Sequence, residues 1–299
     1  MNSNLIDIDR YIVKPDTKIS LKDYSTEYAE KLLDKSEGKK LLENEKEKLS
    51  ELQDKLYAHN QYSVLIIFQA MDAAGKDGAI KHIMSGLNPS GVKVYSFKTP
   101  SSTVLEHDYF WRHYIALPAR GEIGIFNRSH YENVLVTRVH PEYIMNENLP
   151  EINSLEDINE EFWKQRYKQI NRFEKNIYQN GTIVLKFFLH LSEKEQKQRF
   201  IDRIDDSKKN WKFSPADIKE RKHWNDYQLA YEDALSNTST DYAPWFIIPA
   251  DNKWFSRLAI TNIMYKQFES LKLEYPVVSE ETRSELLKIR EELENENTN

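Results

Sequence analysis

The segment Val64-Leu-Ile-Ile-Phe-Gln-Ala-Met-Asp-Ala-Ala-Gly-Lys-Asp-Gly78 decides the fold. It opens with a continuous apolar run, as in a strand buried on both faces, and then turns to small residues and a lysine. Successive backbone N–H groups of small residues can curl around an anion, a lysine can meet outer phosphate oxygens, and a helix N-terminus favours negative charge. The segment therefore predicts a strand, a phosphate-binding loop over residues 70–78, and a helix.

This loop departs from the G-x-x-x-x-G-K-[ST] pattern at both ends. Ala70 stands at the first glycine, and Asp77 stands at the hydroxyl residue that usually holds Mg²⁺. A carboxylate beside a polyanion is repelled unless a divalent cation lies between them, so we expect Asp72 to bind Mg²⁺ instead. A strand-to-helix turn with an incidental lysine is the alternative. The candidate phosphate-binding residues of this region are Ala73, Ala74, Gly75, Lys76, Asp77, Gly78 and Lys81.

Similar apolar runs recur along the chain, and long helical patterns separate most of them. Strands that alternate with helices form parallel βαβ units, so we expect an α/β sandwich with ligands at the carboxyl ends of its strands. The further strands are expected at residues 92–97, 123–126, 183–189 and 245–248. Residues 21–58 predict a helical arm or hairpin broken near Gly38. The expected regions are an N-terminal helical extension (1–60), a core (61–275), and a C-terminal helix and tail (276–299).

A second polar group, Asn127-Arg-Ser-His-Tyr-Glu132, follows the strand expected at 123–126. An arginine in this place can hold a substrate phosphate by two hydrogen bonds, and a structural salt bridge is the alternative for Arg128. Asn127 replaces the acid that phosphate-loop kinases carry near the metal, so it could order a metal-bound water but supplies no charge. For His130 and Tyr131 we weigh a packing role equally with substrate contact.

A third group lies between Ser192 and Lys212, where seven basic residues stand against five acids. Ser192 and Ser214 each begin an S-x-x-E/D capping pattern, so we expect helices on both sides of a polar loop at residues 205–213. Such a segment can close over phosphates as a lid, although solvated charged helices of this composition are common. Lysines are also in excess within residues 76–98, which suggests a substrate with more negative charge than a single nucleotide. The candidate lid residues are Arg199, Arg203, Lys208 and Lys209.

Composition excludes several classes of protein. The chain has 299 residues, a formal net charge of −6 and no cysteine. The charge excludes a globally basic nucleic-acid coat, and the lack of cysteine excludes disulfides, thiolate metal sites and a cysteine nucleophile. The apolar runs are too short for a bilayer, and residues 1–18 lack a secretory core. We therefore expect a cytoplasmic protein without nucleic-acid or membrane partners.

Taken together, the motifs resemble the polyphosphate kinase 2 family. The resemblance runs in order from about Ile12 to Leu271 and rests on Asp72-Ala-Ala-Gly-Lys-Asp-Gly78, His107-Asp108 with Trp111-Arg112, Asn127-Arg-Ser-His-Tyr-Glu132, and Asn210-Trp-Lys-Phe-Ser214. It implies a P-loop kinase fold related to thymidylate kinase: a three-layer sandwich with a parallel five-stranded sheet, a helical lid at about 192–235, and the N-terminal helical extension. It also implies a homodimer or homotetramer.

Carried over by position, the resemblance implies a role for each site residue. Lys76 and the loop amides would hold phosphate, Asp72 would bind the metal, and Arg128 would grip a transferring or acceptor phosphate. Arg199, Arg203, Lys208 and Lys209 would belong to the lid. The candidate nucleotide-binding residues are Arg112, Asn127, Arg128 and Glu132.

The resemblance also implies the reaction. Gln69-Ala-Met-Asp72 together with Asn127-Arg-Ser-His-Tyr-Glu132 resembles class III of the family, which phosphorylates both AMP and ADP, whereas the class I pattern has aspartate at 127 and asparagine at 132. The expected reaction is reversible, Mg²⁺-dependent, in-line transfer of the terminal phosphoryl group of inorganic polyphosphate to AMP and ADP, forming ADP and ATP. The alternatives are an ATP-dependent nucleoside or nucleotide kinase of the same fold and a non-catalytic polyphosphate- or nucleotide-binding protein.

Overall fold

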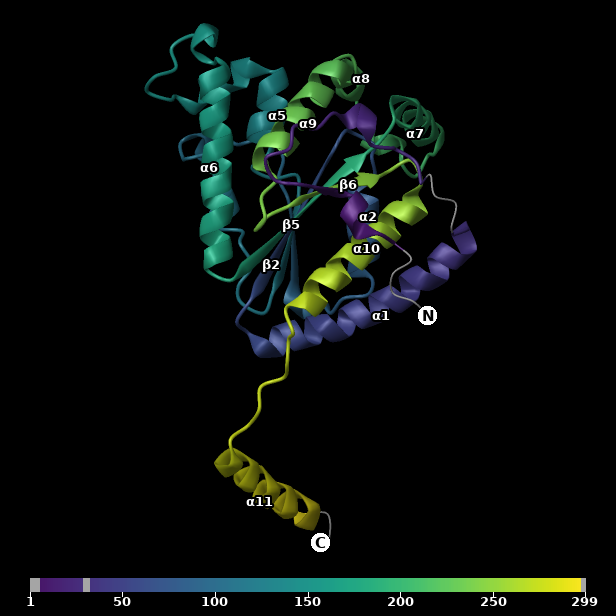
Figure 1. The fold of residues 1–299 in the computed structure, drawn as a ribbon, viewed down its shortest axis with the longest axis vertical. Helices are drawn as coiled ribbons and strands as arrows, with labels where there is room; N and C mark the ends of the chain where they lie inside the picture. Colours follow the sequence, from purple (N-terminus) through teal and green to yellow (C-terminus); the bar gives the residue numbers. More distant parts are fainter. Residues whose placement is uncertain (1–5, 29–32, 297–299) are drawn as a thin grey trace.

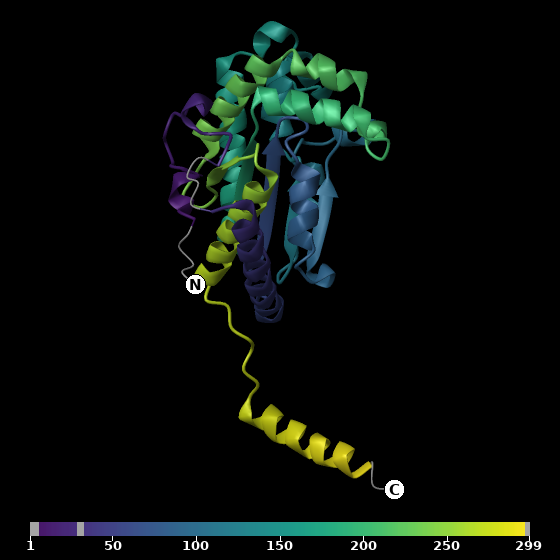
Figure 2. The ribbon, with the colours of Figure 1, turned by 90° about the vertical axis from the view of Figure 1, so that its right-hand side faces the viewer.

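The computed structural model describes residues 6–28 and 33–296. Its centre is a six-stranded sheet in the order β1-β6-β5-β2-β4-β3, with helices on both faces (Figures 1 and 2). Five strands are parallel, as expected from the sequence: β2 (Ser63–Ala70), β3 (Val92–Ser96), β4 (Ile123–Asn127), β5 (Thr182–His190) and β6 (Trp245–Pro249). The sixth, β1 (Ile12–Val13), pairs antiparallel with β6 at one edge. The expected α/β fold is confirmed, with one more strand than predicted.

The register of the sheet brings the two expected polar segments together. β2 is buried along its whole length and lies between β4 and β5. Phe68 pairs with Asn127 on one side and with Phe187 on the other. Because parallel strands end at the same edge of a sheet, the loop after β2 and the turn after β4 leave the sheet side by side.

Three helices cover one face: α1 (Lys35–His59), α2 (Lys76–Met84) and α10 (Lys253–Ser270). The expected break near Gly38 is wrong, because α1 is continuous over 25 residues and Gly38 lies in its first turn, after a capping box made by Asp34. A Cβ at Gly38 would lie 2.3 Å from the Trp254 ring. The glycine therefore lets α1 approach α10 closely. The remainder of the predicted arm is a 3₁₀ turn (Leu21–Asp23) and extended chain, with residues 29–32 outside the described part.

The other face carries α5 (Glu132–Val139), α6 (Glu160–Gln179) and α9 (Trp224–Thr238), with short helices α3 (Ser102–Leu105) and α4 (Trp111–Tyr114) nearby. Above the carboxyl edge lie α7 (Glu193–Asp205) and α8 (Pro215–Arg221). Ser192 and Ser214 cap these two helices through their side chains, as predicted. The other 3₁₀ turns are Ile8–Arg10, Pro89–Gly91, Pro141–Glu147, Leu155–Asp157 and Asn210–Lys212.

The last helix, α11 (Glu280–Glu296), extends away from the body of the protein (Figures 1 and 2), and all of its residues are exposed. Within the part of the chain that the structure describes, we find no helix with the length and hydrophobicity that a bilayer crossing requires.

Candidate functional site

The loop after β2 forms one wall of an open cleft. Between the end of β2 at Ala70 and the start of α2 at Lys76, the chain turns through two left-handed residues, Ala73 (φ 61°) and Gly75 (φ 104°). Glycine takes such a conformation without strain, which explains its place directly before the helix. All residues from Asp72 to Gly78 line the cleft, whose volume is about 1020 Å³. The cleft is large enough for an extended polyanion, and a helix N-terminus faces it.

Lys76 is buried at the base of this cleft, with 9% of its surface exposed. Its Nζ donates to the Ala70 carbonyl over 2.8 Å, so the ammonium folds back over the loop. Burial lowers the pKa of Lys76 to about 8, and Arg128 adds to this effect, while the carboxylates of Asp72 and Glu132 oppose it. A phosphate oxygen bound in the cleft would stabilise the protonated, charged form of Lys76 and so raise its pKa again.

Arg128 connects the two polar segments. Its Nη2 lies 3.2 Å from Asp72 Oδ1, and its Nη1 lies 3.8 Å from Glu132 Oε2. The salt bridge considered for Arg128 is therefore present, yet 43% of its side chain stays exposed. Its backbone is left-handed (φ 65°), and its N–H donates to the Phe68 carbonyl. A non-glycine residue held in this conformation costs free energy, and such strain is concentrated at functional sites.

The oxygen donors beside the loop suit a hard divalent cation. Asp72 and Asp77 both line the cleft. Asn127 donates from Nδ2 to Asp77 Oδ1 over 2.8 Å, which ties the end of β4 to the first turn of α2. The described residues contain no cluster of three or more His, Cys, Asp or Glu side chains that could cage a metal. One or two carboxylates completed by waters and substrate phosphates are the environment that Mg²⁺ commonly takes.

A second cavity, of about 320 Å³, opens on the other side of Arg128. Its walls are more apolar and include Phe97, Tyr109 and Tyr143, and the Arg112 guanidinium lies 5.5 Å from the centre of the Phe97 ring. Glu132 lines this cavity, and burial raises the pKa of its carboxyl group. The two cavities share four lining residues: Phe97, Lys98, Thr99 and Arg128. An aromatic pocket thus adjoins a charged cleft.

The structure brings only part of the predicted basic set to the cleft. Arg199, Arg203 and Lys209 line it, whereas Lys81 and Lys208 are not among the described residues that do so. Their contact with phosphate stays a prediction. Within residues 76–98, Lys98 reaches the cleft, while Lys93 pairs with Glu122 over 2.8 Å.

Two further residues at the loop and the cleft were not among the predicted site residues. Lys253 begins α10, shortly after the carboxyl end of β6, and lines the cleft. Gln196 donates from Nε2 to the Asp72 carbonyl. Both come from segments more than a hundred residues from the loop along the chain.

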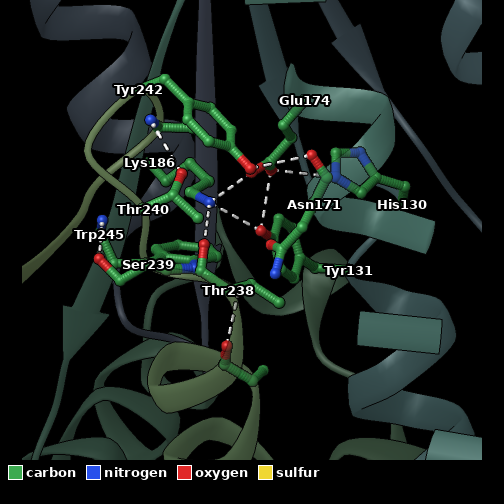
Figure 3. A network of polar contacts seen from close by, with 12 residues as sticks. His130, Tyr131, Asn171, Glu174, Lys186, Thr238, Ser239, Thr240, Tyr242 and Trp245 are labelled. Atoms are coloured by element: carbon green, nitrogen blue, oxygen red, sulfur yellow. Dashed lines mark hydrogen bonds and ion pairs between the residues drawn. The ribbon is translucent and has the colours of Figure 1, made fainter. Parts of the chain in front are cut away.

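The residues after Arg128 are anchored in a buried polar network (Figure 3). The Lys186 Nζ donates to Glu174 (2.6 Å), to the Tyr131 hydroxyl (2.9 Å) and to the Thr238 carbonyl (2.7 Å), and the Tyr131 hydroxyl donates to Glu174. Burial would raise the pKa of Glu174, but its contacts with Lys186 and His130 together outweigh burial and lower that pKa. Of the two roles weighed for Tyr131, the fully buried position favours packing.

Comparisons with known proteins agree with this geometry. The family model described as Polyphosphate kinase 2 (PPK2) matches residues 32–276. The chain is 51% identical over 253 residues to the ADP-polyphosphate phosphotransferase of Rhodopseudomonas palustris, covering 85% of this chain and 86% of that protein. It is 44% identical over 242 residues to the AMP/ADP-polyphosphate phosphotransferase of Meiothermus ruber, covering 81% and 84%.

Solved structures point the same way. The crystal structure of polyphosphate kinase 2 from Arthrobacter aurescens TC1 superimposes with a TM-score of 0.83 at 34% identity, covering 94% of this chain and 98% of that one. A family model that spans most of the chain, relatives matched over most of their length, and the same fold all agree. The chain belongs to the polyphosphate kinase 2 family.

Proposed function

We propose that this protein transfers the terminal phosphoryl group of inorganic polyphosphate to ADP and AMP, forming ATP and ADP, reversibly and with Mg²⁺. The observation that carries the proposal is the pair of cavities that meet at Arg128. The charged cleft fits a linear polyphosphate, and the aromatic pocket fits a nucleoside. A phosphoryl group passing between them would lie beside the Arg128 guanidinium.

Phosphoryl transfer of this kind requires electrostatic stabilisation by the site rather than a general base. The attacking phosphate oxygen of AMP or ADP is already deprotonated at neutral pH, so no general base is needed. The task of the residues is to hold two polyanions in line and to neutralise the charge on the transferring group. Lys76 and the loop amides would bind the donor, and Arg128 would hold the transferring phosphoryl group by a bidentate contact. Asp72 and Asp77 would hold Mg²⁺, which supplies charge neutralisation when bound.

The acceptor range depends on Glu132. One relative carries ADP alone in its name, whereas another names both AMP and ADP. Glu132 lines the aromatic pocket directly beside Arg128, on the side where the phosphates of an acceptor would enter. A shorter acceptor such as AMP leaves one phosphate position empty, and an acidic side chain there can hold a second cation or ordered water. This supports acceptance of AMP as well as ADP.

One assay tests the proposal. The protein is incubated with Mg²⁺, ADP and polyphosphate, without ATP, and the ATP formed is measured; a second reaction contains AMP, and its ADP is measured. A third reaction omits polyphosphate, because a nucleotide kinase can convert two ADP into ATP and AMP. ATP that forms only when polyphosphate is present separates the proposal from an ATP-dependent kinase and from a non-catalytic binding protein. Absence of product in both reactions would overturn the proposed function, and product from ADP alone would remove AMP from it.

A further inference from the structure

The phosphate-binding loop is held from outside by one face of α7. Gln196 and Arg199 are three residues apart and therefore share a helical face. The Gln196 Nε2 donates to the Asp72 carbonyl over 3.0 Å, and the Arg199 Nη1 donates to the carbonyls of Ala73 (3.1 Å) and Ala74 (2.8 Å). Three successive carbonyls of the loop are thus bound by two side chains of one helix.

Arg199 has every donor engaged. A guanidinium carries five N–H groups. Besides its bonds to the loop, its Nε donates to Glu195, and its Nη2 donates to the carbonyls of Ala250 (2.6 Å) and Asp251 (3.1 Å) in the turn after β6. Only 5% of the residue is exposed. Arg199 joins α7, the loop and the β6–α10 turn through contacts that would be lost if it bound a phosphate instead.

The direction of these carbonyls determines the direction of the amides. In a trans peptide, the C=O and the following N–H point to opposite sides of one plane, and the chain contains no cis peptide among the residues described. Pulling the Ala74 carbonyl toward Arg199 turns the Gly75 N–H the other way. The same holds for the Asp72 carbonyl and the Ala73 N–H. An anion-binding loop needs its amides fixed before the anion arrives.

We propose that Gln196 and Arg199 are positioning residues that hold the phosphate-binding loop in its anion-binding form, and that Arg199 does not itself bind polyphosphate. This rests on the proposed function and replaces the role that the sequence suggested for Arg199. The arrangement extends to α8, because Arg221 donates from Nη1 to Gln196 Oε1. The base of α7 is therefore part of the loop's scaffold, while Arg203 and Lys209 further along are placed to meet substrate.

The test compares Arg199→Lys with Arg203→Lys, its matched control one turn later on α7, in the full chain. Amide hydrogen exchange is followed in the substrate-free protein at Ala74, whose N–H donates to the Met71 carbonyl, and at Ala79, whose N–H donates to Gly75. A lysine keeps the charge but cannot make the five contacts. We expect exchange at these amides to rise roughly tenfold or more in Arg199→Lys and to stay unchanged in Arg203→Lys. The turnover number with polyphosphate should fall in the first variant, with little change in KM.

The opposite pattern identifies a direct ligand. If exchange in free Arg199→Lys equals that of wild type and KM for polyphosphate rises, Arg199 binds substrate and the proposal is overturned. Should Arg199→Lys not fold, Glu195→Gln weakens the alignment of Arg199 more gently and must show the same loop-specific exchange. Failure of wild type to make ATP would overturn the proposed function alone, because the exchange measurement needs no activity.

Discussion

At the scale of single residues, Lys76 ties the chemistry to pH. Burial lowers its pKa to about 8 in the free protein, and only its protonated form attracts phosphate. The kcat/KM for polyphosphate, which reports ionisations of the free enzyme, should therefore be constant below pH 8 and fall toward tenfold per pH unit above it. Bound phosphate raises the pKa of the lysine, so kcat should stay level to higher pH. In Lys76→Arg the side chain remains charged at alkaline pH. If kcat/KM of that variant fell with pH in the same way as in wild type, the titrating group would not be Lys76.

Removal of either charged side chain beside the loop should lower kcat far more than a substitution on the protein surface does. Lys76→Ala removes the ammonium at the base of the cleft, and Asp72→Ala removes the carboxylate that pairs with Arg128. Each should lower kcat by at least about 10²-fold, as for loss of an electrostatic stabiliser in other enzymes. Steady-state ATP formation from polyphosphate measures this, with Lys39→Ala at an exposed position of α1 as the comparison. Near-normal turnover in Asp72→Ala or Lys76→Ala would remove the site assignment.

Glu132 should decide between acceptors. Glu132→Gln keeps the size and shape of the side chain but removes its charge from the wall of the aromatic pocket. We expect the rate with AMP to fall roughly tenfold or more while the rate with ADP changes little, because loss of one charge-assisted contact costs about 1.5–3 kcal/mol. The ratio of kcat/KM for the two acceptors is the measurement. Equal losses with AMP and ADP would show that Glu132 serves Arg128 rather than acceptor choice.

At the scale of elements, Gly38 shows how closely α1 packs on α10. A Cβ there would lie 2.3 Å from the Trp254 ring, so Gly38→Ala should destabilise the fold by about 1–3 kcal/mol in spite of the higher helix propensity of alanine. Thermal or urea unfolding measures the change. Lys39→Ala, at an exposed position of the same turn, should be near neutral. A more stable Gly38→Ala would mean that the two helices separate without cost.

The sequence predicted some helices and strands better than others. The five parallel strands lie in short, largely apolar runs, so their positions and type followed from the pattern, whereas their order in the sheet did not. Ile12 and Val13 form a strand too short to show a period, and its partner β6 lies over 200 residues away. The loop glycine, Lys76 and Arg128 were predictable because local motifs carry them. The anchoring by Arg199 was not, because its contacts run to backbone carbonyls of distant turns.

At the scale of the whole molecule, the subunit arrangement and the cytoplasmic location stay predictions. The C-terminal helix α11 carries exposed apolar side chains at Leu286, Leu287, Ile289 and Leu293. Their spacing of three and four residues places most of them along one side of the helix. A homodimer or homotetramer could bury that side, and size-exclusion chromatography of the chain with and without residues 276–299 would measure its contribution to assembly.

The distribution of charge over the molecule predicts a strong dependence on salt. The net charge is −6, yet the described cleft gathers positive side chains from five parts of the chain: Lys76, Lys98, Arg128, Arg203, Lys209 and Lys253. A linear polyanion that binds there releases its condensed counterions. Each contact between a phosphate and a basic side chain therefore adds roughly 0.7 to 0.9 to the slope of log affinity against log salt concentration. For long polyphosphate, log kcat/KM should fall against log salt with a slope of roughly −3 to −5. Tripolyphosphate reaches fewer of these side chains and should give a shallower line; equal slopes for the two donors, or no slope at all, would argue against an extended binding groove.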